Sequence, residues 1–357
     1  MKGVFMGNLF IIGNGFDLAH GLSTRYEDFH QYLKLVNHSE VSKPESRNVI
    51  KFLIDVVDDA EKFDGYIDDY KWTDFESSLN FLDFTNYLQS FDRYYEIYGF
   101  NYNEYIYEDF YELDSNIEYN GLLACISPEA ELLDYKIDYR NNKEIIEDVE
   151  HALHQENEIS ILNEKEALKI LEYCSYLHKY FYEWINTIQI DKKVKRKIDF
   201  YNLINSNDSI FINFNYTKTL ELLYEVNSSK IFHIHGIQGG NIVLGHGDEE
   251  MEIDYSIYVG SEYILESVYE SLKKDTNKVI VENENFFDSL VEKIDKIYSF
   301  GFSFSEVDLI YIRKICKTIE TKDIIWYIND FDKNKNYRAI IKGCGFKGKF
   351  STFVVRK

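Results

Sequence analysis

Imidazole and amide side chains follow two short apolar runs in the second half of this 357-residue chain. His235 stands directly before Gly236 at the end of one run, and Asn215 follows the run at 209–212. Imidazole titrates near neutral pH, so His235 is a candidate to accept or donate a proton or to orient a sugar hydroxyl. Asn215 and Thr217 are candidates to hold ribose hydroxyls or a water molecule.

The same residues also have a structural interpretation. Asn215 or Thr217 would cap a helix that continues through Leu220, since short polar side chains are favoured at helix N-caps. His233, two residues before His235, is interpreted as a core histidine. Two histidines at this spacing are possible metal ligands, but no third ligand stands at a suitable spacing, so no metal is expected.

A glycine-rich segment follows the first apolar run of the chain. It is not the dinucleotide fingerprint G-x-G-x-x-G, because its third glycine comes too late. Glycine nevertheless lets a backbone approach a pyrophosphate closely, and N–H groups near a helix start can meet its charge. A structural turn is the alternative. The candidate phosphate-binding residues are Gly13, Asn14, Gly15, Phe16 and Gly21.

Asp17 lies inside this segment. A carboxylate that faced a phosphate would repel it, whereas one that faced a ribose or a water molecule would be useful. Asp17 is therefore a candidate catalytic residue. The alternative is that Asp17 is the N-cap of the following helix.

A third segment rich in glycine and hydroxyl groups begins at Gly301, after the apolar run at 297–300. Ser303 and Ser305 are candidates to bind ribose or phosphate. Glu306 and Asp308 are expected in the first turn of the next helix, where the helix dipole favours acidic side chains. Helix capping by itself accounts for these two acids.

Two further residues are left open as members of the site. Glu76 and Asp74 lie beside Trp72 and Phe75, and apolar surroundings can raise the pKa of a carboxyl group toward catalytic use. More often such acids are solvated. His246 stands between two glycines near a predicted strand end, and its role is undetermined.

Segments with strand-like and helical patterns alternate along much of the chain. Helical spacing follows the first apolar run, from Tyr26 to Val36, and lies between several later runs. Alternation of strands and helices is typical of a parallel sheet, whose carboxyl edge binds ligands. The sequence therefore predicts an α/β, Rossmann-like, mainly parallel sheet. The predicted strands are 9–12, 209–212, 230–233, 242–244, 297–300 and 324–328.

Residues 37–199 carry few strand signals. Their clearest apolar face runs from Ala167 to Trp184 at helical spacing, and helices are also expected near 50–57 and 75–82. The sequence thus predicts a nucleotide-binding α/β domain at 1–36 and 200–357, with a mostly helical insertion at 37–199.

Within this insertion, the segment from Tyr94 to Leu113 holds seven tyrosines among acidic residues. We interpret the segment as a half-buried aromatic wrapper whose hydroxyl groups reach water. A lid or a partner surface is the alternative.

The acidic composition limits the classes of partner. A net charge of −23 argues against nucleic-acid binding, because that affinity comes from Lys and Arg that displace counterions. The basic run Lys192–Lys197 is interpreted as a solvated helix start or a domain junction. An acidic surface also disfavours anionic membranes. The four cysteines are scattered and no stretch reaches the length of a membrane span, so we expect reduced thiols and a cytoplasmic protein.

The order and spacing of these segments resemble the bacterial AbiH family of phage abortive-infection proteins. The stretch Ile12–Leu22 is the most specific match, and the segments 72–76, 214–217, 234–236 and 301–308 follow in the family's order. The resemblance spans nearly the whole chain. It implies a role in phage defence, with a phage protein as a possible trigger.

A more distant resemblance is to sirtuin-like NAD-binding domains, several of which destroy NAD in phage defence. The zinc module of the deacetylases is missing, so protein deacetylation is not expected. Thr217 stands where many relatives have Asp, and Asp17 stands where a small hydroxyl residue is common. The resemblance implies that Gly13, Gly15 and Gly21 cradle NAD, that Asn215 holds the ribose or a water, that His235 acts at the ribose hydroxyls, and that Gly301 with Ser303 meets the adenosine half.

Two functions from different classes follow from these observations. The first is NAD binding with hydrolysis of the nicotinamide–ribose bond, in a protein for which a homo-oligomer is one expected state. The second is a nucleotide- or ADP-ribose-sensing module without turnover, which engages a partner protein through the helical insertion. A nuclease has only the scattered acids in its favour, and the net charge counts against it.

Overall fold

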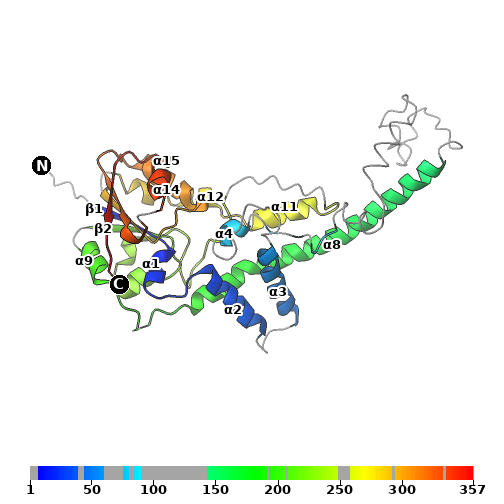
Figure 1. The fold of residues 1–357 in the computed structure, drawn as a ribbon, viewed down its shortest axis with the longest axis horizontal. Helices are drawn as coiled ribbons and strands as arrows, with labels where there is room; N and C mark the ends of the chain where they lie inside the picture. The colour runs from blue at the N-terminus through cyan, green and yellow to red at the C-terminus, as the bar shows by residue number, and fades with distance from the viewer. Residues whose placement is uncertain are drawn as a thin grey trace, which may run out of the picture. The chain divides into compact units, whose positions relative to one another are not determined.

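A computed structural model describes residues 7–38, 44–59, 75–79, 82, 84, 86–89, 143–191, 193–205, 208–247, 258–291, 294–332 and 335–356. Six strands among these residues form one sheet, in which every pair of neighbouring strands is parallel. Figure 1 shows the fold of the chain, with β1 and β2 labelled. The predicted Rossmann-like α/β class is confirmed. Along the chain the strands are β1 (Gly7–Ile12), β2 (Ser209–Asn213), β3 (Ile231–His233), β4 (Ile294–Phe300), β5 (Ile325–Asn329) and β6 (Lys349–Phe353). In the sheet their order is β3-β2-β1-β4-β5-β6.

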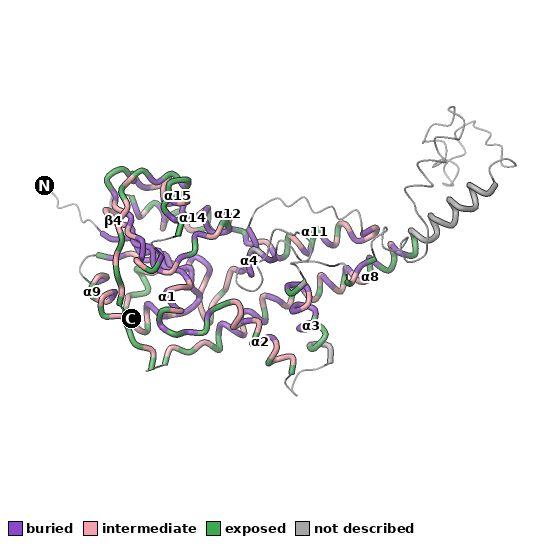
Figure 2. Tube along the Cα trace, viewed as in Figure 1, coloured by how far each residue is buried: buried purple, intermediate pink, exposed green. Residues whose placement is uncertain are grey.

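The central strand β1 is apolar at successive positions because helices cover both faces of the sheet. Successive side chains of a strand point to opposite faces, so Leu9 and Ile11 enter one core and Phe10 and Ile12 enter another. Figure 2 shows the buried residues gathered along the central strands. This double burial fixes the register of β1, since a shift by one residue would exchange the two faces.

The helices divide between the two faces according to these cores. The core with Leu9 includes residues of α12 (Thr276–Glu282), α13 (Glu284–Asp288), α14 (Glu306–Thr318) and α15 (Tyr337–Gly343). The core with Phe10 includes residues of α1 (Asn14–Ala19), α9 (Ile198–Asn205) and α10 (Thr219–Tyr224).

The direction of strand addition reverses between β1 and β4. From β1 the chain adds β2 and β3 on one side, and then adds β4, β5 and β6 on the other. In open parallel sheets, ligands bind beyond the carboxyl ends of the strands at such a switch point. The loops that follow β1 and β4 are therefore the first places to look for a site.

Five of the six predicted strands are confirmed. The predicted strand at 242–244 is wrong, because Gly236 turns the chain with φ +83° and Ile242 makes only an isolated antiparallel bridge with Gly236. The sequence analysis missed β6, an edge strand that lacks an apolar run. Its five residues include two exposed positions and none that is fully buried.

The described parts of residues 37–199 are helical where they have regular structure. They contain the last two residues of α2 (Tyr26–His38), α3 (Pro44–Asp59), α4 (Phe75–Ser78), α8 (Lys143–Thr187) and the first two residues of α9. The helix expected near 75–82 is shorter than predicted, since α4 ends at Ser78. The aromatic segment 94–113, Trp72 and Asp74 lie outside the described residues.

The chain divides into two compact units. The first holds residues 1–83, 173–251 and 270–357, and the second holds 84–172 and 252–269, including most of α11 (Glu262–Ser271). In the second unit, the Asn163 amide donates to the backbone oxygens of Gln89 and Val259. The domain boundaries predicted near residues 36 and 200 stay a prediction. None of the described helices combines the length and the apolar composition that crossing a membrane requires.

Candidate functional site

Four ionisable side chains meet at the carboxyl edge of the sheet, within the first unit. His235 follows β3, Asp308 lies in the first turn of α14, Lys274 precedes α12, and Glu76 belongs to α4. All four are buried, with exposed fractions of 3% for His235, 6% for Asp308, 7% for Glu76 and 0% for Lys274. Buried charges persist in proteins only when they are paired, so the contacts among these groups decide their chemistry.

The ammonium group of Lys274 lies at the centre of this cluster. Its Nζ atom is 2.9 and 3.0 Å from the two carboxylate oxygens of Glu76, 3.5 Å from Oδ1 of Asp308, and 3.3 Å from Nε2 of His235. Nε2 of His235 is in turn 3.1 Å from Oδ1 of Asp308. The cluster therefore contains one cation shared by two carboxylates, with an imidazole beside them.

The contact with Asp308 sets the tautomer of His235. A carboxylate can only accept a hydrogen bond and an ammonium group can only donate one, so Nε2 cannot serve both Asp308 and Lys274. The contact with Asp308, at 3.1 Å, is shorter than that with Lys274, at 3.3 Å, and we therefore assign the imidazole proton to Nε2, from which it is donated to Oδ1 of Asp308. Nδ1 of the neutral ring is then unprotonated. A carboxylate that holds one imidazole nitrogen orients the ring and stabilises the imidazolium that forms when the other nitrogen takes up a proton.

The two carboxyl groups differ in their affinity for protons. Burial raises the pKa of Glu76, and the negative charge of Asp308 adds to this increase against the attraction of Lys274. Burial also acts to raise the pKa of Asp308, but the positive charge of Lys274 and the hydrogen bonds from His235 and Lys274 outweigh it and lower that pKa to about 2. The carboxylates together raise the pKa of Lys274 despite its burial. Asp308 and Lys274 are thus charged at neutral pH.

The backbone around His246 places Lys274. His246 N donates to Leu272 O at 3.0 Å, and Lys274 N donates to His246 O at 2.9 Å. This close approach requires Gly245, whose φ is +153° and whose added Cβ would lie 2.3 Å from Leu272 O. His246, which sequence reasoning left open, therefore contributes to the site through its backbone.

Aromatic rings surround the imidazole of His235. Its ring centroid lies 5.2 Å from that of Phe214, 6.1 Å from that of Tyr216 and 6.0 Å from that of Tyr311. The Tyr216 hydroxyl donates to the backbone oxygen of Val243 at 2.9 Å, which fixes this ring. The cluster therefore combines negative charge with aromatic surface.

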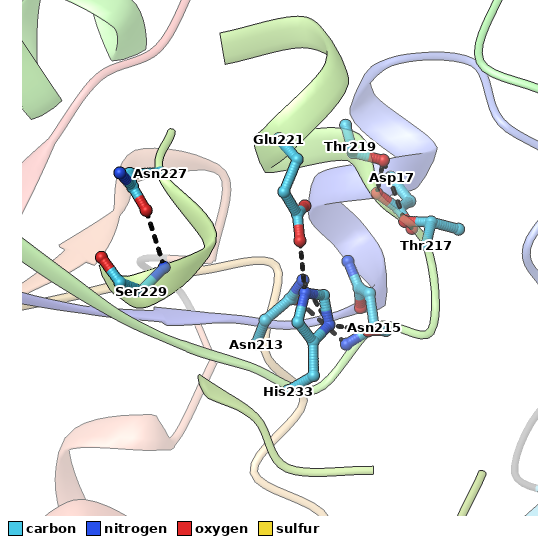
Figure 3. A network of polar contacts seen from close by, with 9 residues as sticks. All are labelled: Asp17, Asn213, Asn215, Thr217, Thr219, Glu221, Asn227, Ser229 and His233. Atoms are coloured by element: carbon cyan, nitrogen blue, oxygen red, sulfur yellow. Dashed lines mark hydrogen bonds and ion pairs between the residues drawn. The ribbon is translucent and has the colours of Figure 1, made fainter. Parts of the chain in front are cut away.

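A second buried carboxylate, Asp17, lies in α1 (Figure 3). Its two oxygens accept hydrogen bonds from Thr217 Oγ1 at 2.5 Å and Thr219 Oγ1 at 2.8 Å. Burial raises the pKa of Asp17 to about 6, and the hydroxyl hydrogen bonds only partly oppose this increase. Asp17 thus joins α1 to the start of α10.

Replacing Asp17 with Asn is expected to make stability less sensitive to pH. Between the ordinary pKa of 3.8 and the folded value of about 6, the folded protein holds more protons than the unfolded chain, so wild-type stability falls as pH rises through this window. Relative to wild type, Asp17→Asn should gain up to about 3 kcal/mol between pH 4 and pH 7. Urea unfolding at a series of pH values measures this difference. A constant difference across the window would contradict the prediction.

The helix-cap interpretations of these residues are wrong. The N-cap of α1 is Gly13, and Asp17 lies inside the helix. The N-cap of α10 is Lys218, so neither Asn215 nor Thr217 caps it. Instead, Asn215 Nδ2 donates to Gly13 O at 3.1 Å and thereby joins the loop after β2 to the loop after β1.

His233 is not the core histidine that the sequence suggested. Its side chain is 11% exposed, and Nε2 lies 2.8 Å from Oε1 of Glu221 in α10 (Figure 3). A histidine at the last position of an edge strand has a polar neighbour available on the adjacent helix. His235, two residues later, lies in the lysine cluster instead.

The predicted phosphate-binding glycines pack against one another. An added Cβ on Gly13 would lie 2.5 Å from Phe302 Cα, and one on Gly15 would lie 2.7 Å from Gly301 Cα. Gly13 N donates to Phe300 O and Gly15 N to Gly301 O, at 3.1 and 2.8 Å. Close packing of the β1 and β4 loops therefore accounts for these glycines, and their N–H groups are already bonded within the chain.

The other residues of the predicted loop differ in surroundings. Phe16 is fully buried in the core with Phe10, and the Asn14 amide exchanges hydrogen bonds with Thr24. Gly21 adopts φ +79°, and an added Cβ there would meet nothing within 4 Å. Ser303 is exposed in the loop after β4 and is accessible to a ligand.

Sequence reasoning missed two members of the lysine cluster. Asp308 does lie in the first turn of α14, as expected, but it faces inward, whereas Glu306 pairs with Arg313 in an exposed contact. Lys274 carried no signal, since nothing in its local sequence distinguishes it from the adjacent Lys273. Only its burial does.

Fold and site together define an α/β protein with the strand order of dinucleotide-binding sheets and a buried acid–base cluster at its carboxyl edge. The profile of a family described as bacteriophage abortive infection AbiH matches residues 9–330. The chain belongs to this family, which implies a role in abortive-infection defence against phage. No curated protein and no solved structure matched the chain. The matched range includes Asp17, Glu76, His235, Lys274 and Asp308.

Proposed function

We propose that this protein acts in phage defence by binding NAD and hydrolysing the bond between nicotinamide and ribose. The observation that carries the proposal is the contact between His235 Nε2 and Asp308 Oδ1 at the carboxyl edge of the sheet. The strand order supports a dinucleotide as the ligand, because this order is that of dinucleotide-binding sheets.

In this proposal His235 is the general base. Its unprotonated Nδ1 accepts a proton from the attacking water or from a ribose hydroxyl, and Asp308 stabilises the resulting imidazolium. The C–N bond breaks with its electron pair going to the nicotinamide nitrogen, which becomes neutral, and water oxygen forms the new bond to the ribose carbon. The products are nicotinamide, ADP-ribose and one proton.

Asn215 and Asp17 have supporting roles in this scheme. Asn215 holds the loop after β1 through Gly13 O, and Asp17 joins that loop's helix to Thr217 and Thr219. Both contacts fix the walls of the site, so that binding energy is available to orient the reacting groups. Ser303 and the loop at Gly301 are proposed to meet the adenosine half.

The test uses the purified full chain. Isothermal titration with NAD and with ADP-ribose measures binding, and chromatography of the same samples measures free nicotinamide. Binding with release of nicotinamide is the expected result. Absence of binding by both ligands would remove the proposal.

A second candidate is a nucleotide or ADP-ribose sensor without turnover, which engages a partner through the helical segments. The observation in its favour is that His235 is 3% exposed, so the base is closed to a dinucleotide in this conformation. Binding of ADP-ribose without nicotinamide release from NAD would favour it. Repeating the assay with a phage lysate, and following the oligomeric state by light scattering, separates a sensor from an enzyme that needs a phage trigger or assembly.

A further inference from the structure

We infer that the Lys274 ammonium is an internal occupant of a cation-binding site formed by Glu76, Asp308 and aromatic rings, and that a ligand with a delocalised positive charge takes its place. The inference rests on the proposed function for the choice of ligand: oxidised nicotinamide in NAD is a pyridinium, and its departure leaves an oxocarbenium-like ribose. It goes beyond the proposed function in two respects: the site recognises the positive charge of the ligand, and Lys274 blocks the site until that ligand displaces it.

The first step is the charge of the cluster. When Glu76 and Asp308 are both ionised and His235 is neutral, two negative charges face one ammonium group, and the net charge is −1. Lys274 therefore does not fully neutralise the site. The four side chains are buried, so little water screens their charges, and an unbalanced negative charge there attracts a positive group strongly.

The second step is the shape of the surroundings. Phe214, Tyr216 and Tyr311 lie around the imidazole of His235. Aromatic faces attract cations and suit planar rings, so a pyridinium that lies between the carboxylates and the rings beside His235 gains contacts that a hydrated inorganic ion does not. Carboxylates with aromatic walls thus match the chemistry of oxidised nicotinamide better than that of its uncharged reduced form.

The third step is the way in which Lys274 is attached to the fold. Lys274 lies outside any helix or strand, between α11 and α12, and its charge is carried on a flexible four-carbon stem. The following residue, Asp275, caps α12 by accepting a hydrogen bond from Lys278 N at 2.9 Å. Displacement of the ammonium group by a ligand would therefore require rotation of the side chain, with the backbone and α12 in place.

The decisive experiment compares a cation with its neutral counterpart. Binding of 1-methylnicotinamide, a pyridinium, and of nicotinamide is measured by titration calorimetry for wild type and Lys274→Ala. We expect Lys274→Ala to bind 1-methylnicotinamide at least about tenfold more tightly than wild type, with unchanged nicotinamide affinity. Lys274→Gln, whose amide keeps a donor for Glu76, is the second variant if Lys274→Ala does not fold, and it should change in the same direction.

Two controls separate charge from space. Lys273→Met removes the adjacent lysine, whose side chain is 31% exposed and pairs with Glu270, and should leave both affinities unchanged. Lys274→Ala combined with Glu76→Gln keeps the vacated space but removes one negative charge, and it should lose most of the gain for the cation. Equal gains for both probes, or no gain for the cation, would overturn the inference.

Displacement can also be read in the wild-type protein. Lys274 is fully buried, so acetic anhydride should leave it unmodified while exposed lysines react. Saturating 1-methylnicotinamide should make Lys274 reactive, as detected by mass spectrometry of its peptide, and nicotinamide should not. If Lys274 stays protected with the cation bound, displacement is wrong. Neither readout needs NAD hydrolysis. Displacement of Lys274 can therefore be observed in a protein that does not hydrolyse NAD, and NAD hydrolysis can be observed in one whose Lys274 stays in place.

Discussion

Replacement of His235 with alanine is expected to lower the rate of nicotinamide release from NAD by about 10²–10⁴-fold, the range typical of losing a general acid or base. The reason is that the proposed base is removed, and Asp308 then has no imidazole to orient. Asp308→Asn should also lower the rate, because the amide no longer stabilises an imidazolium. Timed chromatography of nicotinamide measures both effects under the conditions in which wild type is active.

The matched control is His233→Gln. His233 lies two residues before His235, but it contacts Glu221 rather than Asp308, so this variant should keep most of the wild-type rate. Circular dichroism and thermal unfolding confirm that each variant is folded. Wild-type turnover by folded His235→Ala would remove His235 as the base, and an equal loss in His233→Gln would point to a general effect on the edge of the sheet.

Replacement of Gly301 with alanine is expected to cause a large loss of stability. Gly301 has φ +66°, and an added Cβ would lie 2.2 Å from Phe16 N and 2.4 Å from Gly15 C. Backbone strain and overpacking act together, each at roughly 1–3 kcal/mol, so we expect a loss of roughly 2–6 kcal/mol in the free energy of unfolding. Urea unfolding measures it, and the soluble yield of the variant should fall accordingly.

Gly21→Ala separates the two causes. Gly21 has a similar φ of +79°, but an added Cβ there meets no atom within 4 Å. It should therefore cost only the left-handed backbone conformation, about 1–2 kcal/mol. Equal losses at the two positions would show that the contact between the β1 and β4 loops is not as close as the structure places it.

The fold class was predictable because its causes are local. A strand buried on both faces must be a short apolar run, as β1 is, and a helix must repeat its apolar residues at 3.6-residue spacing, as α8 does. Elements at the edge of the sheet are not buried on both faces, so their sequences need not carry an apolar run. The strand β6 has no apolar run, and residues 242–244 have one without forming a strand.

The candidate site was predictable in part. His235, Asn215 and Asp17 could be proposed because each follows the carboxyl end of a predicted strand, which a sequence shows directly. The hydrogen-bond partners of these residues could not be predicted, because they depend on which loops the fold brings next to each side chain. The acids after Ser305 look alike in sequence, yet α14 turns Asp308 inward and leaves Glu306 to Arg313 at the surface.

The sequence by itself determined the parallel α/β sheet and the positions of the polar residues at its carboxyl edge, since both depend on neighbours along the chain. Only the tertiary structure decided that Lys274 joins Glu76, 198 residues away, and Asp308, 34 residues away. A lysine in a short connection has no periodicity that reports burial. Its placement follows from the packing of the loop at Gly245 against Leu272, and that packing makes an ordinary lysine the central charge of the site.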